Sequence, residues 1–115
     1  MIEKEKDIND AVDHLYTHGA RYAEAKAHRY YLEEFRKTIK ARLMKEAIEK
    51  GIAKSSAAAE MEAYADESYK THLQATRAAQ EQEETLRWGL VSAQARIDVW
   101  RSQEASNRAF DKVVT

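Results

Sequence analysis

The amino-acid sequence predicts an all-α protein built as a long antiparallel helical hairpin. The 115 residues include no proline and three glycines, which leaves few places for a turn. Ala, Glu, Lys, Arg and Gln, all good helix formers, are abundant. After Gly51 the chain runs from Ser56 to about Phe110 without a turn cluster. Such a helix of about 55 residues cannot bury its apolar side alone, so we expect a coiled-coil-like, oligomeric protein.

The first main helix is predicted over about residues 7–50. Asp7 or Asn9 can cap its start. Its apolar residues recur at helical spacing, at Ile8, Val12, Leu15, Tyr22, Leu32, Phe35, Ile39 and Leu43. Gly19 either interrupts this helix briefly or leaves it continuous, because glycine costs about 1 kcal/mol inside a helix. The basic Lys50 followed by Gly51 is typical of a helix C-terminus.

The second main helix is predicted over about residues 56–110, after a turn at 51–55. Ser55 or Ser56 can supply the N-cap oxygen, and so short a connection favours antiparallel neighbours within one domain, 1–115. Steps of four and three define a heptad pattern, at Ala65, Tyr69, His72, Thr76, Ala79, Glu83, Leu86, Leu90, Ala93, Ile97 and Trp100. We call these eleven positions the inner seam.

The apolar end of the inner seam is the predicted interface with a partner. The residues assigned to it are Leu86, Leu90, Ile97 and Trp100, together with Trp88. Exposed apolar stripes usually mark interfaces, and buried tryptophans are frequent anchors there. We therefore expect a dimer or higher homo-oligomer that also binds another protein.

Charge leaves a nucleic-acid interface as the alternative. Nineteen basic and twenty acidic residues nearly cancel, but residues 35–54 contain seven basic and two acidic side chains. Residues 60–84 show the reverse ratio, so folding at Gly51 pairs the two blocks. The alternative assigns nucleic-acid contacts to Arg36, Lys37, Lys40 and Arg42. Salt-dependent DNA binding would favour it.

No pattern in the sequence predicts catalysis, a cofactor or a metal site. There is no cysteine, no Gly-x-Ser-x-Gly and no glycine-rich phosphate loop. His14 and His18 are four residues apart on one face, but two ligands do not make a site. The N-terminal residues resemble no signal peptide and no apolar run reaches about 18 residues, so we expect a cytoplasmic protein with no membrane partner.

One stretch resembles a known group of proteins. Tyr69-Lys-Thr-His-Leu and the segment Glu84-Thr-Leu-Arg-Trp-Gly-Leu-Val to Asn107-Arg108 resemble small uncharacterised all-helical proteins of tailed phages and prophages. Such proteins are often encoded in early regions beside recombination and replication genes. The resemblance, which covers mainly residues 69–108, implies an accessory role in phage DNA metabolism in the host cytoplasm and partners from the phage or host.

Overall fold

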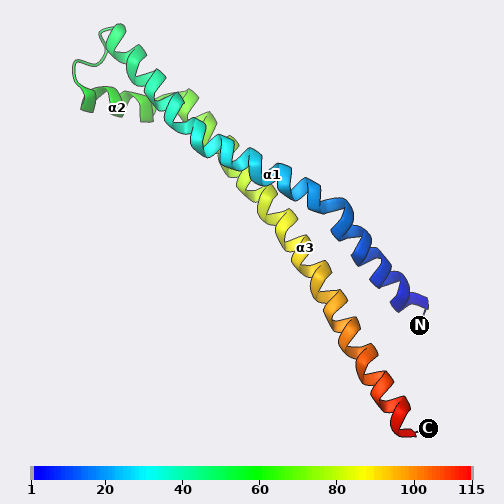
Figure 1. Ribbon diagram of the computed structural model, residues 1–115. Coiled ribbons are helices and arrows are strands. Elements are labelled where there is room, and N and C mark those ends of the chain that lie inside the picture. Colours follow the sequence, from blue (N-terminus) through cyan, green and yellow to red (C-terminus); the bar gives the residue numbers. More distant parts are fainter. Residues whose placement is uncertain (1, 115) are drawn as a thin grey trace. The chain divides into compact units, whose positions relative to one another are not determined.

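The computed structural model describes the backbone of residues 2–114 and the side chains of residues 6–114. It contains helices α1 (Ile2–Glu49), α2 (Ser56–Ala65) and α3 (Glu67–Val114), which follow one another in Figure 1. Between Ile2 and Val114 the non-helical residues are 50–55 and Asp66. The prediction of an all-α protein is confirmed. None of the described helices is long and apolar enough to cross a membrane.

Helix α1 is continuous through Gly19 and begins at Ile2, five residues before the predicted start. A methyl group placed on Gly19 would meet no atom within 4 Å other than the adjacent backbone of its own helix. The residues before Asp7 are Met, Ile, Glu and Lys, without Gly or Pro. They extend the helix past Asp7 and Asn9, so neither predicted cap is needed at its start.

The connection from α1 to α2 contains the predicted helix-terminating glycine and the predicted capping serine. Gly51 has φ +73°, the left-handed conformation that glycine adopts at low cost. Its N–H donates to the carbonyl of Ile48 at 3.1 Å, and the N–H of Ile52 donates to that of Ala47 at 3.0 Å. This pair of bonds is a Schellman motif, which terminates a helix. The hydroxyl of Ser55 accepts from the N–H of Ala58 at 3.1 Å and caps α2.

The second predicted helix, 56–110, is wrong as a single element because it breaks at Asp66. The backbone of Asp66 is extended, with φ −72° and ψ 140°. Its Oδ1 accepts from the N–H of Ser68 at 2.8 Å, and its carbonyl accepts from the N–H groups of Tyr69 and Lys70. Asp66 is therefore the N-cap of α3, and Glu67 stands in the first turn where a negative charge is favourable. Helix α3 ends at Val114 rather than about Phe110.

The chain divides into two compact units, which are described separately. Unit 1 comprises Met1–Ala23 with Glu84–Thr115, and unit 2 comprises Glu24–Glu83. In unit 2 one apolar cluster contains the buried Ile39, Leu43, Ala63 and Tyr69, with Phe35 and Met44 packed against it. A second cluster beside the turn contains Ala47, Ala53 and Ala59.

The contacts in unit 2 join α1 to the other two helices in a regular order. Arg29 contacts Glu83, and Lys40 contacts Glu60. His72 lies between Glu60 and Glu83 in the sequence, and its Nε2 is 2.6 Å from the carbonyl oxygen of Leu32, which lies between Arg29 and Lys40. Residue numbers thus fall along α3 and α2 as they rise along α1.

Small residues lie where the helices of unit 1 approach. Ala11 on α1 is fully buried and Ala93 on α3 is 3% exposed. A methyl group on Gly89 would lie 3.1 Å from Nε2 of His14, so the α1 side chain occupies the space that glycine leaves open. The absence of larger side chains allows this approach.

Candidate interaction surface on α3

The inner seam predicted from the heptad pattern is the covered face of the helices after the turn. Ala65 is exposed, and the other ten positions are buried or half-buried. Four of the five predicted interface residues lie on this face in unit 1, and all four are half-buried: Leu86, Leu90, Ile97 and Trp100.

Trp88, the fifth predicted interface residue, lies on a different face of α3. At 3.6 residues per turn it points roughly 160° away from the mean direction of the inner seam. Its side chain is 58% exposed, and the guanidinium carbon of Arg87 lies 4.6 Å from its ring centroid. The structure therefore places Trp88 on a different face of α3 from the other four residues.

The face that begins at Trp88 is built from uncharged residues over several helical turns, and the guanidinium of Arg87 lies over the Trp88 ring at its start. Steps of four and three from Trp88 define a second heptad pattern, which we call the outer stripe: Trp88, Ser92, Ala95, Val99, Ser102, Ser106, Ala109 and Val113. Every one of these residues is exposed, as are the flanking Val91 and Phe110. In a chain that is 34% charged, seven turns of helix without a charge on one face distinguish this surface from an ordinary solvated one.

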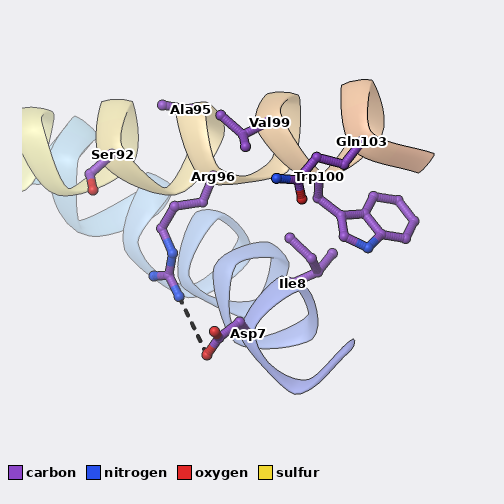
Figure 2. A pocket seen from close by; sticks show the side chains of 8 residues that line it. All are labelled: Asp7, Ile8, Ser92, Ala95, Arg96, Val99, Trp100 and Gln103. Carbon is purple, nitrogen blue, oxygen red and sulfur yellow. Dashed lines mark ion pairs between the residues drawn. The ribbon is translucent and has the colours of Figure 1, made fainter. Parts of the chain in front are cut away.

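A groove in unit 1 borders the outer stripe. It has a volume of about 370 Å³ and is lined by Asp7, Ile8, Ser92, Ala95, Arg96, Val99, Trp100 and Gln103. Figure 2 shows Ile8 of α1 lying beside the Trp100 ring of α3. At the other end of the groove Arg96 reaches Asp7, with Nη2 3.8 Å from Oδ1. Because Ser92, Ala95 and Val99 belong to both features, the groove extends the outer stripe toward Trp100.

The four residues assigned to nucleic acid do not form one cationic surface. Lys37 lies 3.5 Å from Glu34, and Arg42 lies 4.0 Å from Glu46. At 3.6 residues per turn, Arg42 points at least roughly 120° away from the other three cations. Arg36 and Lys37 line a groove that is also lined by Glu33 and Glu34.

Lys40, the fourth of these cations, is oriented by contacts within unit 2. Its Nζ lies 3.3 Å from a carboxylate oxygen of Glu60 and 4.7 Å from the ring centroid of Tyr64. Interaction with Tyr64, and secondarily with Glu60, raises the pKa of Lys40 above its ordinary value. Three of the four predicted phosphate contacts thus have a carboxylate neighbour, which weakens their attraction for phosphate.

A polar cluster in unit 2 was not predicted as a unit. Arg29 donates from Nε to Glu83 Oε2 at 2.6 Å and from Nη2 to Oε1 at 3.0 Å. It also donates from Nη1 to Glu33 at 3.1 Å, and Gln80 donates to the same Glu33 carboxylate at 3.1 Å. The bonds to Glu83 and then to Glu33 raise the pKa of Arg29, and the bond from Gln80 is the main cause of a lowered pKa at Glu33. The sequence feature that could have predicted this cluster was Glu83, because a carboxylate on the inner seam needs a polar partner.

The histidine pair on α1 stacks rather than opening toward a common ligand. The rings of His14 and His18 have centroids 3.9 Å apart and an interplanar angle of 7°. Nδ1 of His18 lies 2.9 Å from the hydroxyl of Thr17 and 3.2 Å from the carbonyl oxygen of His14. Among the described residues no group of three or more His, Cys, Asp or Glu side chains is arranged to hold a metal ion.

No protein-family model, curated protein or solved structure matches the chain.

Proposed function

We propose that this protein is a non-catalytic helical interaction protein, a coiled-coil-like hairpin that self-associates and binds another protein through α3. The observation that carries the proposal is the exposed, uncharged outer stripe. Apolar surface that extends over several helical turns is favourably removed from water by a partner. The inner seam is already covered, whereas the outer stripe is exposed and the adjoining groove lies beside it, so both are open to a partner on the part of α3 in unit 1.

The contacts in unit 2 support the hairpin part of the proposal. Their order along α1, α2 and α3 is the order that two antiparallel helical segments produce when a short turn joins them. The heptad spacing of the inner seam supports coiled-coil-like packing of these segments.

The resemblance of residues 69–108 to phage proteins supplies the proposed setting. In that setting the protein acts as an accessory factor in DNA recombination or replication in the host cytoplasm, through a phage or host protein partner. The carboxylates beside Lys37, Lys40 and Arg42 favour a protein partner over direct DNA binding.

The test compares two glutamate substitutions in a pull-down from infected or lysogenic host cells. Val99→Glu puts a charge in the middle of the outer stripe, where the side chain is 57% exposed. Val12→Glu makes the same change on α1, at a residue that is 48% exposed and outside the stripe. We expect Val99→Glu to lose the captured partner and Val12→Glu to retain it, since a buried carboxylate without a partner is costly.

The pull-down also has results that would contradict the proposal. Retention of every captured protein by Val99→Glu would exclude the outer stripe as the binding surface. A parallel titration of DNA binding against salt addresses the alternative. Tight binding that weakens steeply with salt and requires Arg36 would replace the proposed function with DNA binding.

A further inference from the structure

The turn at Gly51 positions α2 against α1 but does not by itself set the register of α3, that is, which residues of α3 face which residues of α1. In unit 2 the buried residues of α2 are Ala59 and Ala63, and the next buried residue is Tyr69 of α3. That step of six departs from the steps of four and three in the inner seam, because the extended backbone of Asp66 separates the two helices. The register of α3 therefore depends on contacts of α3 itself.

Most of the inner seam that follows Tyr69 in unit 2 does not distinguish one register from another. Its next positions, His72, Thr76 and Ala79, carry no large apolar side chain. Nε2 of His72 lies 2.6 Å from the carbonyl oxygen of Leu32, but every residue has such a carbonyl, so this contact can form in more than one register.

The contact between Arg29 and Glu83 is specific to one register. Nε and Nη2 of Arg29 donate to the two carboxylate oxygens of Glu83, at 2.6 and 3.0 Å. Glu83 is buried and is the only carboxylate among the eleven positions of the inner seam. The seam positions one heptad away from it are Thr76 and Leu90, and neither offers two acceptors to a guanidinium.

We propose that the ion pair of Arg29 and Glu83 selects the register in which α3 packs against α1. The bond from Gln80 to Glu33, at 3.1 Å, joins the same two helices in the same register. A polar pair at a heptad position is an established way for helices to specify register. All four side chains belong to unit 2, so the inference is independent of the partner proposed for the outer stripe.

A slip by one heptad in either direction separates the two charges. On α1 the positions one heptad away from Arg29 are Tyr22 and Arg36. In one slipped register Glu83 would stand opposite Tyr22, and in the other it would stand opposite Arg36 while Arg29 stood opposite Leu90. Each slip thus places at least one charge of the pair opposite an uncharged side chain, which is unfavourable where water is excluded.

The ion pair is expected to contribute more to the choice of register than to stability. Replacing a buried ion pair by apolar residues of similar size often leaves stability unchanged or raises it, whereas removing one partner is costly. We therefore expect the double variant Arg29→Leu/Glu83→Leu to keep or raise the midpoint of urea denaturation. The single variant Arg29→Leu should lower that midpoint, because Glu83 then loses its donor.

Introduced cysteines can report the register, because the chain contains no cysteine. Lys37 of α1 and Arg77 of α3 are exposed and line the same groove. Lys70 and Glu84, also exposed, lie one heptad before and after Arg77, roughly 10 Å away along the helix. Three double variants combine Lys37→Cys with Arg77→Cys, Lys70→Cys or Glu84→Cys, and each is treated in dilute solution with a short bis-maleimide.

The expected cross-links differ between backgrounds. With Arg29 and Glu83 in place, we expect rapid cross-linking of residue 37 to residue 77 alone. In the Arg29→Leu/Glu83→Leu background, cross-linking to residue 70 or residue 84 should become at least about tenfold faster, because no charge then opposes the slip. The reversed pair Arg29→Glu/Glu83→Arg again places a carboxylate opposite a guanidinium and should restore cross-linking to residue 77 alone.

Several results would overturn the proposal. If the double leucine variant cross-links only to residue 77, the turn and the apolar clusters suffice to set the register. Slipped cross-links that persist in the reversed pair, or that form rapidly with Arg29 and Glu83 in place, exclude the pair as the determinant. A double leucine variant that loses its helical circular dichroism, or unfolds at as low a urea concentration as Arg29→Leu, assigns the pair to stability instead.

Discussion

Substitution of Gly89 by alanine tests the close approach of α1 and α3 in unit 1. Alanine is favoured over glycine in a helix by about 1 kcal/mol. At Gly19 an added methyl group has open space, so Gly19→Ala should gain the full amount. At Gly89 the methyl carbon would lie 3.1 Å from Nε2 and 3.6 Å from Cε1 of His14. Ordinary contacts are about 3.5–4.0 Å, so His14 must move by several tenths of an ångström.

The surroundings of His14 make that movement costly. Its ring is half-buried and stacked on His18 with a centroid separation of 3.9 Å. Adding a group to a packed contact typically costs about 1–3 kcal/mol. Set against the gain of about 1 kcal/mol in helix propensity, Gly89→Ala should change the free energy of unfolding by between about 0 and −2 kcal/mol.

Urea denaturation followed by circular dichroism measures both glycine variants. We expect Gly19→Ala to raise the free energy of unfolding and Gly89→Ala to leave it unchanged or lower it. In a His14→Ala background the obstruction is absent, so Gly89→Ala should then stabilise by about 1 kcal/mol. The reasoning is refuted if Gly89→Ala stabilises the otherwise unchanged protein as much as Gly19→Ala does.

Three further predictions concern ionisable and capping groups. The pKa of Glu33 is lowered from 4.5, mainly by Gln80, so its stabilising contribution is present above pH 4.5 and lost as pH falls through the folded value. Glu33→Gln should flatten the acid loss of stability in urea titrations, and an unchanged slope would contradict this. The pKa of Lys40 is raised from 10.5, so its contribution is complete below pH 10.5 and lost as pH rises through the folded value. Lys40→Met should reduce that alkaline loss, measured in the same way. Asp66→Ala removes the acceptor for the N–H of Ser68 and should cost about 1 kcal/mol in thermal melts, whereas Asp66→Asn should cost less. Equal melting temperatures for the two Asp66 variants would exclude the cap as the cause.

Local signals predicted the boundaries around the turn because they depend on few neighbouring residues. Gly51 can adopt positive φ and Ser55 can cap whatever the rest of the chain does. Asp66 shows where local reasoning failed. An aspartate inside a run of helix formers is compatible with either a continuous helix or a new cap, and the cap prevailed when its side chain accepted from Ser68.

The candidate surface was predicted less completely than the fold. The heptad pattern identified the covered face of α3, but the covering helix makes Leu90 and Ile97 half-buried rather than freely available. Trp88 was assigned to the same interface from its position beside the seam, although it points away from it. Tertiary packing decides which of two faces of a helix another segment of the chain covers. The sequence of that helix alone therefore does not reveal the covered face.

Because the core of this chain is small, binding of a partner can increase the stability of the folded protein. Among the described residues no large side chain is fully buried, and the inner seam includes the polar His72 and Glu83. A small domain with little buried apolar surface has a small free energy of unfolding. Any partner that binds the folded protein then adds to that stability by mass action. If the outer stripe binds a second copy, the melting temperature should rise with protein concentration in the wild type and not in Val99→Glu. Two exposed rings, Trp88 and Phe110, lie on or beside the outer stripe, so covering that face would add to the stability of the folded chain.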